Sequence, residues 1–117
     1  MRILLIINDA PYGTEKAYNA LRLAMTLQKE SPDVLLRVFL LADAVGCALT
    51  GQETPNGYYN IERMLKSVIS KGCKVKACGS CASARGMAGL DLMGGVELAT
   101  MKDLAAWVSE ADKAIMF

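Results

Sequence analysis

Histidine is absent from this sequence of 117 residues, and lysine and arginine form no run anywhere in it. Without histidine, the chain lacks the most frequent general base of enzymes and a common ligand of structural zinc. Its 13 basic and 12 acidic residues are distributed along the chain and leave a net charge of +1. Because no basic stripe follows a phosphate backbone, we expect no direct nucleic-acid partner.

Long apolar segments are missing as well. The opening run MRILLII ends at Asn8, Asp9 and Pro11, far short of the roughly 20 residues that cross a bilayer. The following NDAPYG lacks the small-residue cleavage site of a secretory signal. We therefore expect a buried first strand, no membrane partner and a cytoplasmic location, where thiols stay mostly reduced.

The phosphate-binding motifs of nucleotide enzymes are also absent. No G-x-G-x-x-G follows the first apolar run, and no G-x-x-x-x-G-K-[ST] occurs anywhere. A receiver domain would need a phosphorylated aspartate where the third strand ends, and the chain has Cys78 there. The sequence predicts no bound cofactor.

Apolar residues, in contrast, make up 53% of the chain. The length suits a single domain over residues 1–117. A domain of this size buries only part of so much apolar surface in its own core. The excess favours a homo-oligomer in which surface is hidden between subunits.

Apolar strand patterns alternate with helical patterns along the whole chain. This order predicts an α/β fold with a five-stranded parallel sheet and helices on both faces. Continuous apolar runs are typical of strands buried on both faces. The expected strands cover residues 2–8, 34–41, 73–78, 95–99 and 113–117, and the expected helices begin at Thr14 as N-cap (to about Lys29), at Ile61 and after Thr100.

Two of these helices have clear apolar faces. In the middle helix the apolar positions recur at helical spacing, and the residues between them are expected to face solvent. The apolar set is Ile61, Met64, Leu65, Val68 and Ile69, and the polar set is Glu62, Arg63, Lys66 and Ser70. In the last helix the expected stripe is Met101, Leu104, Ala105 and Val108; Trp107 lies one position off it and is expected at a subunit contact.

Three of the four cysteines lie in one stretch, CKVKACGSCASARG, residues 73–86. Cys78 follows the third strand and precedes a short helix, whose N–H groups and positive end favour a thiolate. Arg85, about two helical turns on, and Lys76 add positive charge. A thiol in this setting needs no histidine to become reactive. Ligands of parallel sheets bind beyond the carboxyl ends of the strands, so the loop with Pro11, Tyr12 and Gly13 is expected nearby.

Other interpretations of Cys78 and Cys81 stay open. A structural metal site usually needs a second cysteine pair or a histidine pair, and Cys47 and Cys73 stand at unrelated spacings; no metal is predicted. A thioredoxin-like couple uses the same C-x-x-C at a helix start, but that fold places it after an early strand and adds a cis-proline. The two residues also suit a tight turn simply because they are small. Cys73 is expected in the core as a small apolar residue.

The arrangement resembles the DsrE/DsrF-like family over essentially the whole chain. The resemblance rests on PYGTE at residues 11–15, on the spacing from Cys78 to Arg85 and Gly86, and on the closing ADKAIMF. Within the family the chain is most similar to the YchN-type members, which also carry C-x-x-C here, and more distantly to the DsrE and TusD subunits of sulfur relays. The resemblance implies a three-layer α/β/α fold and assembly as trimers or hexamers.

The family resemblance also implies a chemistry. In sulfur-relay members the cysteine matching Cys78 accepts sulfane sulfur as a persulfide from a donor protein and passes it to an acceptor protein. Backbone N–H groups and Arg85 are then expected to stabilise the anion, in a ligand pocket formed with Asn8, Pro11, Tyr12, Gly13 and Gly86. Cys81 departs from the relay subunits; it is a second thiol that could attack the persulfide and release sulfide. The alternative function is a non-catalytic binding or assembly module.

Overall fold

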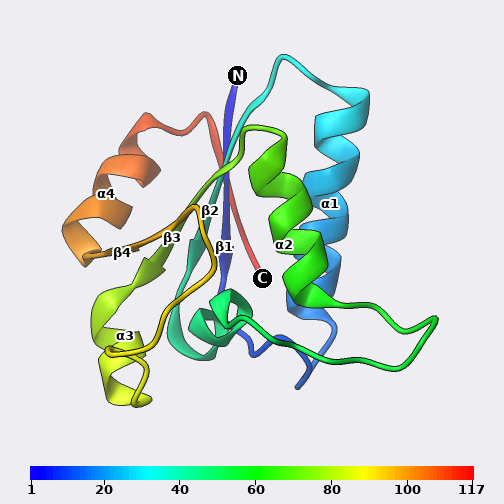
Figure 1. Cartoon of the computed structure of the whole chain (residues 1–117). Coiled ribbons are helices and arrows are strands. Elements are labelled where there is room, and N and C mark those ends of the chain that lie inside the picture. Colours follow the sequence, from blue (N-terminus) through cyan, green and yellow to red (C-terminus); the bar gives the residue numbers. More distant parts are fainter.

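Five short strands form a single parallel sheet in the order β4-β3-β2-β1-β5. The computed structural model describes all residues from 1 to 117. The chain enters at β1, proceeds outward through β2 and β3 to β4, and returns to place β5 on the other side of β1 (Figure 1). The strands are β1 (Arg2–Ile7), β2 (Leu35–Leu40), β3 (Lys74–Cys78), β4 (Val96–Ala99) and β5 (Lys113–Met116).

Helices cover both faces of this sheet. Helices α1 (Lys16–Glu30) and α2 (Ile61–Ser70) pack side by side on one face, and α4 (Met101–Glu110) lies on the other (Figure 1). Helix α3 (Gly79–Ala84) begins at the carboxyl end of β3. A short 3₁₀ helix, η1 (Ala42–Ala48), follows β2 and contacts α3. The predicted α/β/α architecture and parallel sheet are confirmed. None of the helices has the length and apolar character needed to cross a membrane.

The core is built on the two continuous apolar strands that the sequence indicates. Residues 3–7 of β1 are all buried, and so are residues 38–40 of β2. Burial on both faces removes such runs from water, which stabilises the fold by about 25 cal/mol per Å² of apolar surface. The two central strands therefore form the core of the molecule.

Capping residues set where the helices begin. Asn60 accepts a hydrogen bond from Arg63 N–H at 3.0 Å and starts α2. Thr100 starts α4 with a capping box, in which Asp103 accepts a hydrogen bond from the Thr100 N–H. The prediction for Thr14 is wrong by one residue: Glu15 precedes the first helical residue, although the Thr14 hydroxyl still accepts from Lys16 N–H at 3.2 Å.

The face that α4 turns to the sheet differs from the prediction. Leu104 and Trp107 are buried, whereas Met101 is 63% exposed and Val108 44% exposed. Trp107 packs edge-on against Phe39, with ring centroids 6.1 Å apart, so it belongs to the core of the chain itself and not to a subunit contact. Trp107 and Leu104, and not the predicted apolar stripe, therefore form the buried face of α4.

Candidate functional site

The carboxyl ends of the central strands bring two cysteines and three loops together. Strand β3 ends at Cys78, and α3 begins at the next residue, Gly79. The turn is tight: a Cβ atom added at Gly79 would lie 3.4 Å from the carbonyl oxygen of Ala99 at the end of β4. The close approach of two strand ends favours a glycine immediately after the cysteine.

The sulfur of Cys78 accepts hydrogen bonds from the start of α3. Cys78 is the N-cap of α3, and its Sγ accepts from the backbone N–H of Cys81 at 3.3 Å. The hydroxyl of Ser80 lies 3.3 Å from the same sulfur. Cys78 is only 6% exposed, so these groups provide most of the polar surroundings of its sulfur.

These contacts decide the charge state of Cys78. Burial raises the pKa of the Cys78 thiol, but hydrogen bonds from the Cys81 and Ser80 side chains and backbone N–H groups outweigh it. The net pKa of Cys78 lies below that of an ordinary thiol, because a hydrogen bond to the charged form favours that form. Cys78 is therefore the thiol of the pair that ionises first.

Cys81 lies in a different setting, between α3 and η1. Its Sγ accepts from the backbone N–H of Ala42 at 3.3 Å. Burial and the hydrogen bond that Cys81 donates to Cys78 raise the pKa of the Cys81 thiol, while the Ala42 N–H and the charge of Arg85 act in the opposite direction. The net pKa of Cys81 lies above its usual range, so Cys81 keeps its proton to higher pH than Cys78 does.

Arg85 ties α3 to η1. Its Nε donates to Asp43 Oδ1 at 2.9 Å, and its Nη1 donates to the carbonyl oxygen of Cys81 at 3.0 Å. The side chain that the sequence placed beside Cys78 thus contacts the backbone of Cys81 instead. Its positive charge acts on Cys81.

The residues expected to form a ligand pocket lie at the same edge of the sheet. Asn8 and Tyr12, however, form hydrogen bonds with residues outside the expected set. The side-chain amide of Asn8 donates to the carbonyl oxygen of Phe117 at 3.2 Å. The Tyr12 hydroxyl donates to Gln52 Oε1 at 2.6 Å. Pro11 contacts the η1 segment, where its Cδ lies 3.4 Å from a Cβ built at Gly46. Gly13 lies in the same loop, and Gly86 ends α3 with a positive φ of 71°.

A polar network beside this loop was missed by sequence reasoning. The side-chain oxygen of Gln52 accepts hydrogen bonds from the Tyr12 hydroxyl and from the Glu62 N–H. The backbone N–H of Gln52 donates to Glu62 Oε1 at 2.8 Å, and its carbonyl oxygen accepts from the Asn60 side chain. Glu62, expected to face solvent, is consequently only 8% exposed; a lysine one turn on, Lys66, neutralises it at 2.9 Å. Ala42, Asp43 and Ser80 were missed too, and small or loop residues of these types give no signal in a sequence.

The remaining cysteines have apolar surroundings. Burial raises the pKa of Cys47 to about 12 and that of Cys73 to about 12. The prediction that Cys73 lies in the core is confirmed. No cysteine is in a disulfide, and no three or more cysteine, aspartate or glutamate side chains are grouped to hold a metal ion.

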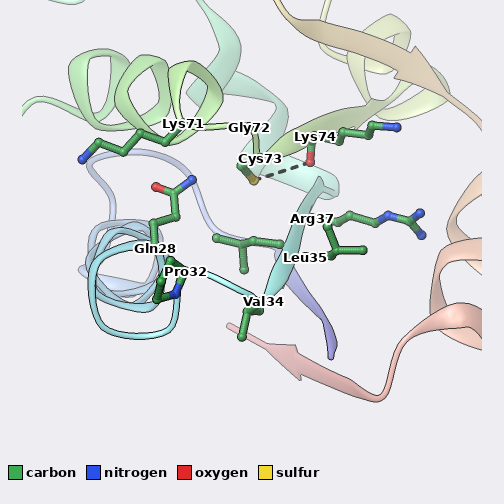
Figure 2. A pocket seen from close by; sticks show the side chains of 10 residues that line it. Gln28, Pro32, Val34, Leu35, Arg37, Lys71, Gly72, Cys73 and Lys74 are labelled. Carbon is green, nitrogen blue, oxygen red and sulfur yellow. Dashed lines mark hydrogen bonds between the residues drawn. The ribbon is translucent and has the colours of Figure 1, made fainter.

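The cavities of the molecule lie at the opposite end of the strands. The largest, of about 440 Å³, opens between the ends of α1 and α2 and the starts of β2 and β3 (Figure 2). Cys73 lies in its wall, with its sulfur directed at the Lys74 carbonyl oxygen, 3.6 Å away. A second cavity of about 300 Å³, beside Trp107, shares Cys73 and Lys74. Neither is lined by Cys78 or Cys81.

Comparisons with known proteins agree with the fold. Residues 1–117 match the DsrE/DsrF-like family, and the chain belongs to that family. Protein YchN of Escherichia coli strain K12 is 41% identical over 116 residues, which is 99% of this chain and 98% of YchN. An uncharacterized protein of Methanopyrus kandleri is 45% identical over 115 residues, 98% of this chain and 93% of that protein.

Solved structures show the same fold. The crystal structure of E. coli YchN superposes with a TM-score of 0.95 at 41% identity and covers 100% of this chain and 99% of that one. A protein of unknown function from Methanobacterium thermoautotrophicum superposes with a TM-score of 0.80 at 18% identity, over 99% of this chain and 98% of that chain. The second likeness extends the α/β fold to distant relatives.

Proposed function

We propose that this protein accepts sulfane sulfur on Cys78 and holds it as a persulfide. The Cys78 thiolate attacks the outer sulfur of a donor persulfide, R–S–SH. A new sulfur–sulfur bond forms on Cys78, the donor's sulfur–sulfur bond breaks, and the donor leaves as the thiolate R–S⁻. An acceptor thiolate later removes the same sulfur in the reverse sense, so that no external oxidant or reductant is required.

The hydrogen bonds to Cys78 Sγ carry this proposal. The N–H of Cys81 reaches that sulfur at 3.3 Å, as does the hydroxyl of Ser80. Such donors stabilise a thiolate before attack and a hydropersulfide anion afterwards. The chain has no histidine, and the lowered pKa of Cys78 supplies the activation that a histidine provides elsewhere.

Loading and unloading of sulfur test the proposal. Purified Cys81→Ser protein, incubated with glutathione persulfide, is expected to gain the mass of a single sulfur atom and to lose it again when excess thiol is added. The double variant Cys78→Ser, Cys81→Ser is the matched control and is expected to gain nothing. Equal gain by both proteins would refute sulfur carriage by Cys78.

We further propose a cytoplasmic homo-oligomer, a trimer or hexamer, that meets separate donor and acceptor proteins. Met101 and Val108 project from α4 into solvent, and Met116 of β5 is 66% exposed. Apolar side chains of this size are costly to leave in water and are covered in oligomers. Light scattering at micromolar concentration should give three or six times the chain mass; a monomer would refute the assembly.

The alternative function is a non-catalytic binding or assembly module. The 6% exposure of Cys78 favours it, because a macromolecular donor must reach that sulfur. On this alternative, the oligomer forms but no sulfur is loaded. The combination of light scattering and sulfur loading distinguishes the two functions.

A further inference from the structure

Cys81 is held by three residues that make no contact with the sulfur of Cys78. The Ala42 N–H donates to Cys81 Sγ, and Arg85 joins the Cys81 carbonyl oxygen to Asp43. Ala42 and Asp43 belong to η1 and Arg85 is the C-cap of α3, so η1 contacts the Cys81 thiol through the Ala42 N–H and is joined to the Cys81 backbone through Arg85. We call Ala42, Asp43 and Arg85 the Cys81 clamp.

The backbone of Ala42 is unusual. It is the single residue other than glycine with a positive φ, at 50°. An L-residue in the left-handed region is strained, and such strain persists only where the surrounding structure imposes it. Here the conformation directs the Ala42 N–H at the sulfur of Cys81. The strained residue therefore provides a hydrogen bond to Cys81, a thiol that a simple sulfur carrier does not need.

The salt bridge of the clamp joins η1 to α3. Arg85 uses two different nitrogens for Asp43 and Cys81, a planar fork that lysine does not reproduce. Both nitrogens point to groups around Cys81. The clamp therefore holds Cys81 beside Cys78, whose sulfur accepts a hydrogen bond from the backbone N–H of Cys81 at 3.3 Å.

We infer that Cys81, positioned by the clamp, resolves the Cys78 persulfide and releases sulfide. This inference rests on the proposed loading of Cys78 and adds a reaction to it: reduction of persulfides by the dithiol pair. The carrier state is then an intermediate, and hydrosulfide is the product.

The Cys81 sulfur attacks Cys78 Sγ, the bond from Cys78 Sγ to the sulfane sulfur breaks, and a Cys78–Cys81 disulfide forms. The sulfane sulfur takes up two electrons and leaves as HS⁻, while the two thiols are oxidised. Because the thiolate and not the thiol is the nucleophile, Cys81 loses its proton to solvent before its sulfur attacks. An external dithiol, such as dithiothreitol or a reduced C-x-x-C protein, restores both thiols for another turnover.

A single-turnover experiment with glutathione persulfide separates carriage from resolution. The parent protein is expected to release roughly one sulfide per chain, measured with a sulfide electrode, and to lose the mass of two hydrogens. Cys81→Ser is expected to keep the added sulfur and to release sulfide at least about tenfold more slowly. Parent protein that holds the sulfur as long as Cys81→Ser does would overturn the inference and leave the proposed loading intact.

Failure of the proposed loading has a different signature. If neither the parent nor Cys81→Ser gains sulfur or releases sulfide, Cys78 does not accept sulfane sulfur and both proposals are wrong. Gain of sulfur by Cys81→Ser with rapid sulfide release by the parent supports both.

The positioning role of Arg85 is tested by the pH profile of sulfide release. Arg85→Gln removes both contacts and the positive charge near Cys81, so release should slow about threefold to tenfold at neutral pH and its profile should move to higher pH. Loading of Cys78 should change far less. Arg85→Lys should restore the pH profile in part, because it keeps the charge without the fork.

Arg63→Gln is the matched control, since Arg63 is an exposed arginine of α2 that forms no ion pair. It should leave both steps unchanged. Equal slowing of loading and release by Arg85→Gln, with no shift of the pH profile, would overturn the positioning role of the clamp.

Discussion

The two ends of β3 carry a cysteine each, and the two thiols are chemically opposite. Cys73 immediately precedes the strand and Cys78 ends it. Both are almost fully buried. Cys73 has a pKa raised to about 12 by burial alone, whereas hydrogen bonds at Cys78 bring its pKa below that of an ordinary thiol. The two residues are about equally shielded from solvent, but Cys73 lies deeper among protein atoms and its sulfur accepts no hydrogen bond, so both its depth and its lack of donors separate it from Cys78.

The same comparison shows that cavity size does not locate the chemistry. The cavities of about 440 and 300 Å³ both adjoin Cys73. Their walls provide its sulfur with a carbonyl acceptor, which cannot stabilise a thiolate. At Cys78 there is less space but several donors. In this fold the reactive end of the strand is the end at which a helix begins.

The largest expected effect is on thiol reactivity. At neutral pH Cys78 should react with iodoacetamide about a thousandfold faster than Cys73, because reactivity follows the thiolate fraction. Quantitative peptide mapping of the folded protein measures both rates in a single sample. Urea-unfolded protein is the control, in which all four cysteines should react alike. Similar rates for Cys73 and Cys78 in the folded state would invalidate the comparison.

The next effect is a loss of stability at alkaline pH. Cys47 and Cys73 keep their protons up to about pH 12 when folded but release them near pH 8.5 when unfolded. Above about pH 8.5 the unfolded state therefore binds fewer protons, and the free energy of unfolding should fall by ~1 kcal/mol per thiol for each pH unit. Below that pH the contribution is fully present.

Urea unfolding of the parent and of Cys73→Ala between pH 8 and 11 measures this slope. Cys73→Ala should show a shallower decline than the parent, since Cys47 is then the single thiol whose pKa burial raises to about 12. Parallel declines for the two proteins would mean that Cys73 does not keep its proton in the folded state.

The smallest effect concerns a single donor. Ser80→Ala removes the hydroxyl beside Cys78 Sγ, so the pKa of Cys78 should rise and its alkylation at neutral pH should slow about threefold. Ser83→Ala, an exposed serine of the same helix, is the control and should have no effect. A Ser80→Ala rate equal to that of the parent would assign the activation of Cys78 to backbone N–H groups alone.

Much of the fold follows from local signals in the sequence. The continuous apolar runs of β1 and β2 and the capping residue Thr100 predict elements that the structure contains within one or two residues. Such signals are readable because burial on both faces and capping each require particular residue types at adjacent positions. The position of Cys78 at a strand end follows from the same reasoning.

What the sequence does not reveal depends on contacts between distant segments. The contact of Ala42 with Cys81 joins residues 39 positions apart, and that of Arg85 with Asp43 joins residues 42 apart. Alanine carries no chemical signal, so its strained backbone cannot be foreseen. The face of α4 was misjudged because the size of Trp107, and not the regular apolar spacing, determines which side packs on the sheet.

The most direct test of the account is the location of sulfane sulfur after loading. Cys81→Ser protein is treated with glutathione persulfide, its persulfides and thiols are blocked by alkylation, and its peptides are mapped by mass spectrometry. The account predicts the extra sulfur on Cys78, with Cys47 and Cys73 unmodified. Extra sulfur on Cys73, at the end of β3 beside the large cavity, with none on Cys78 would contradict it.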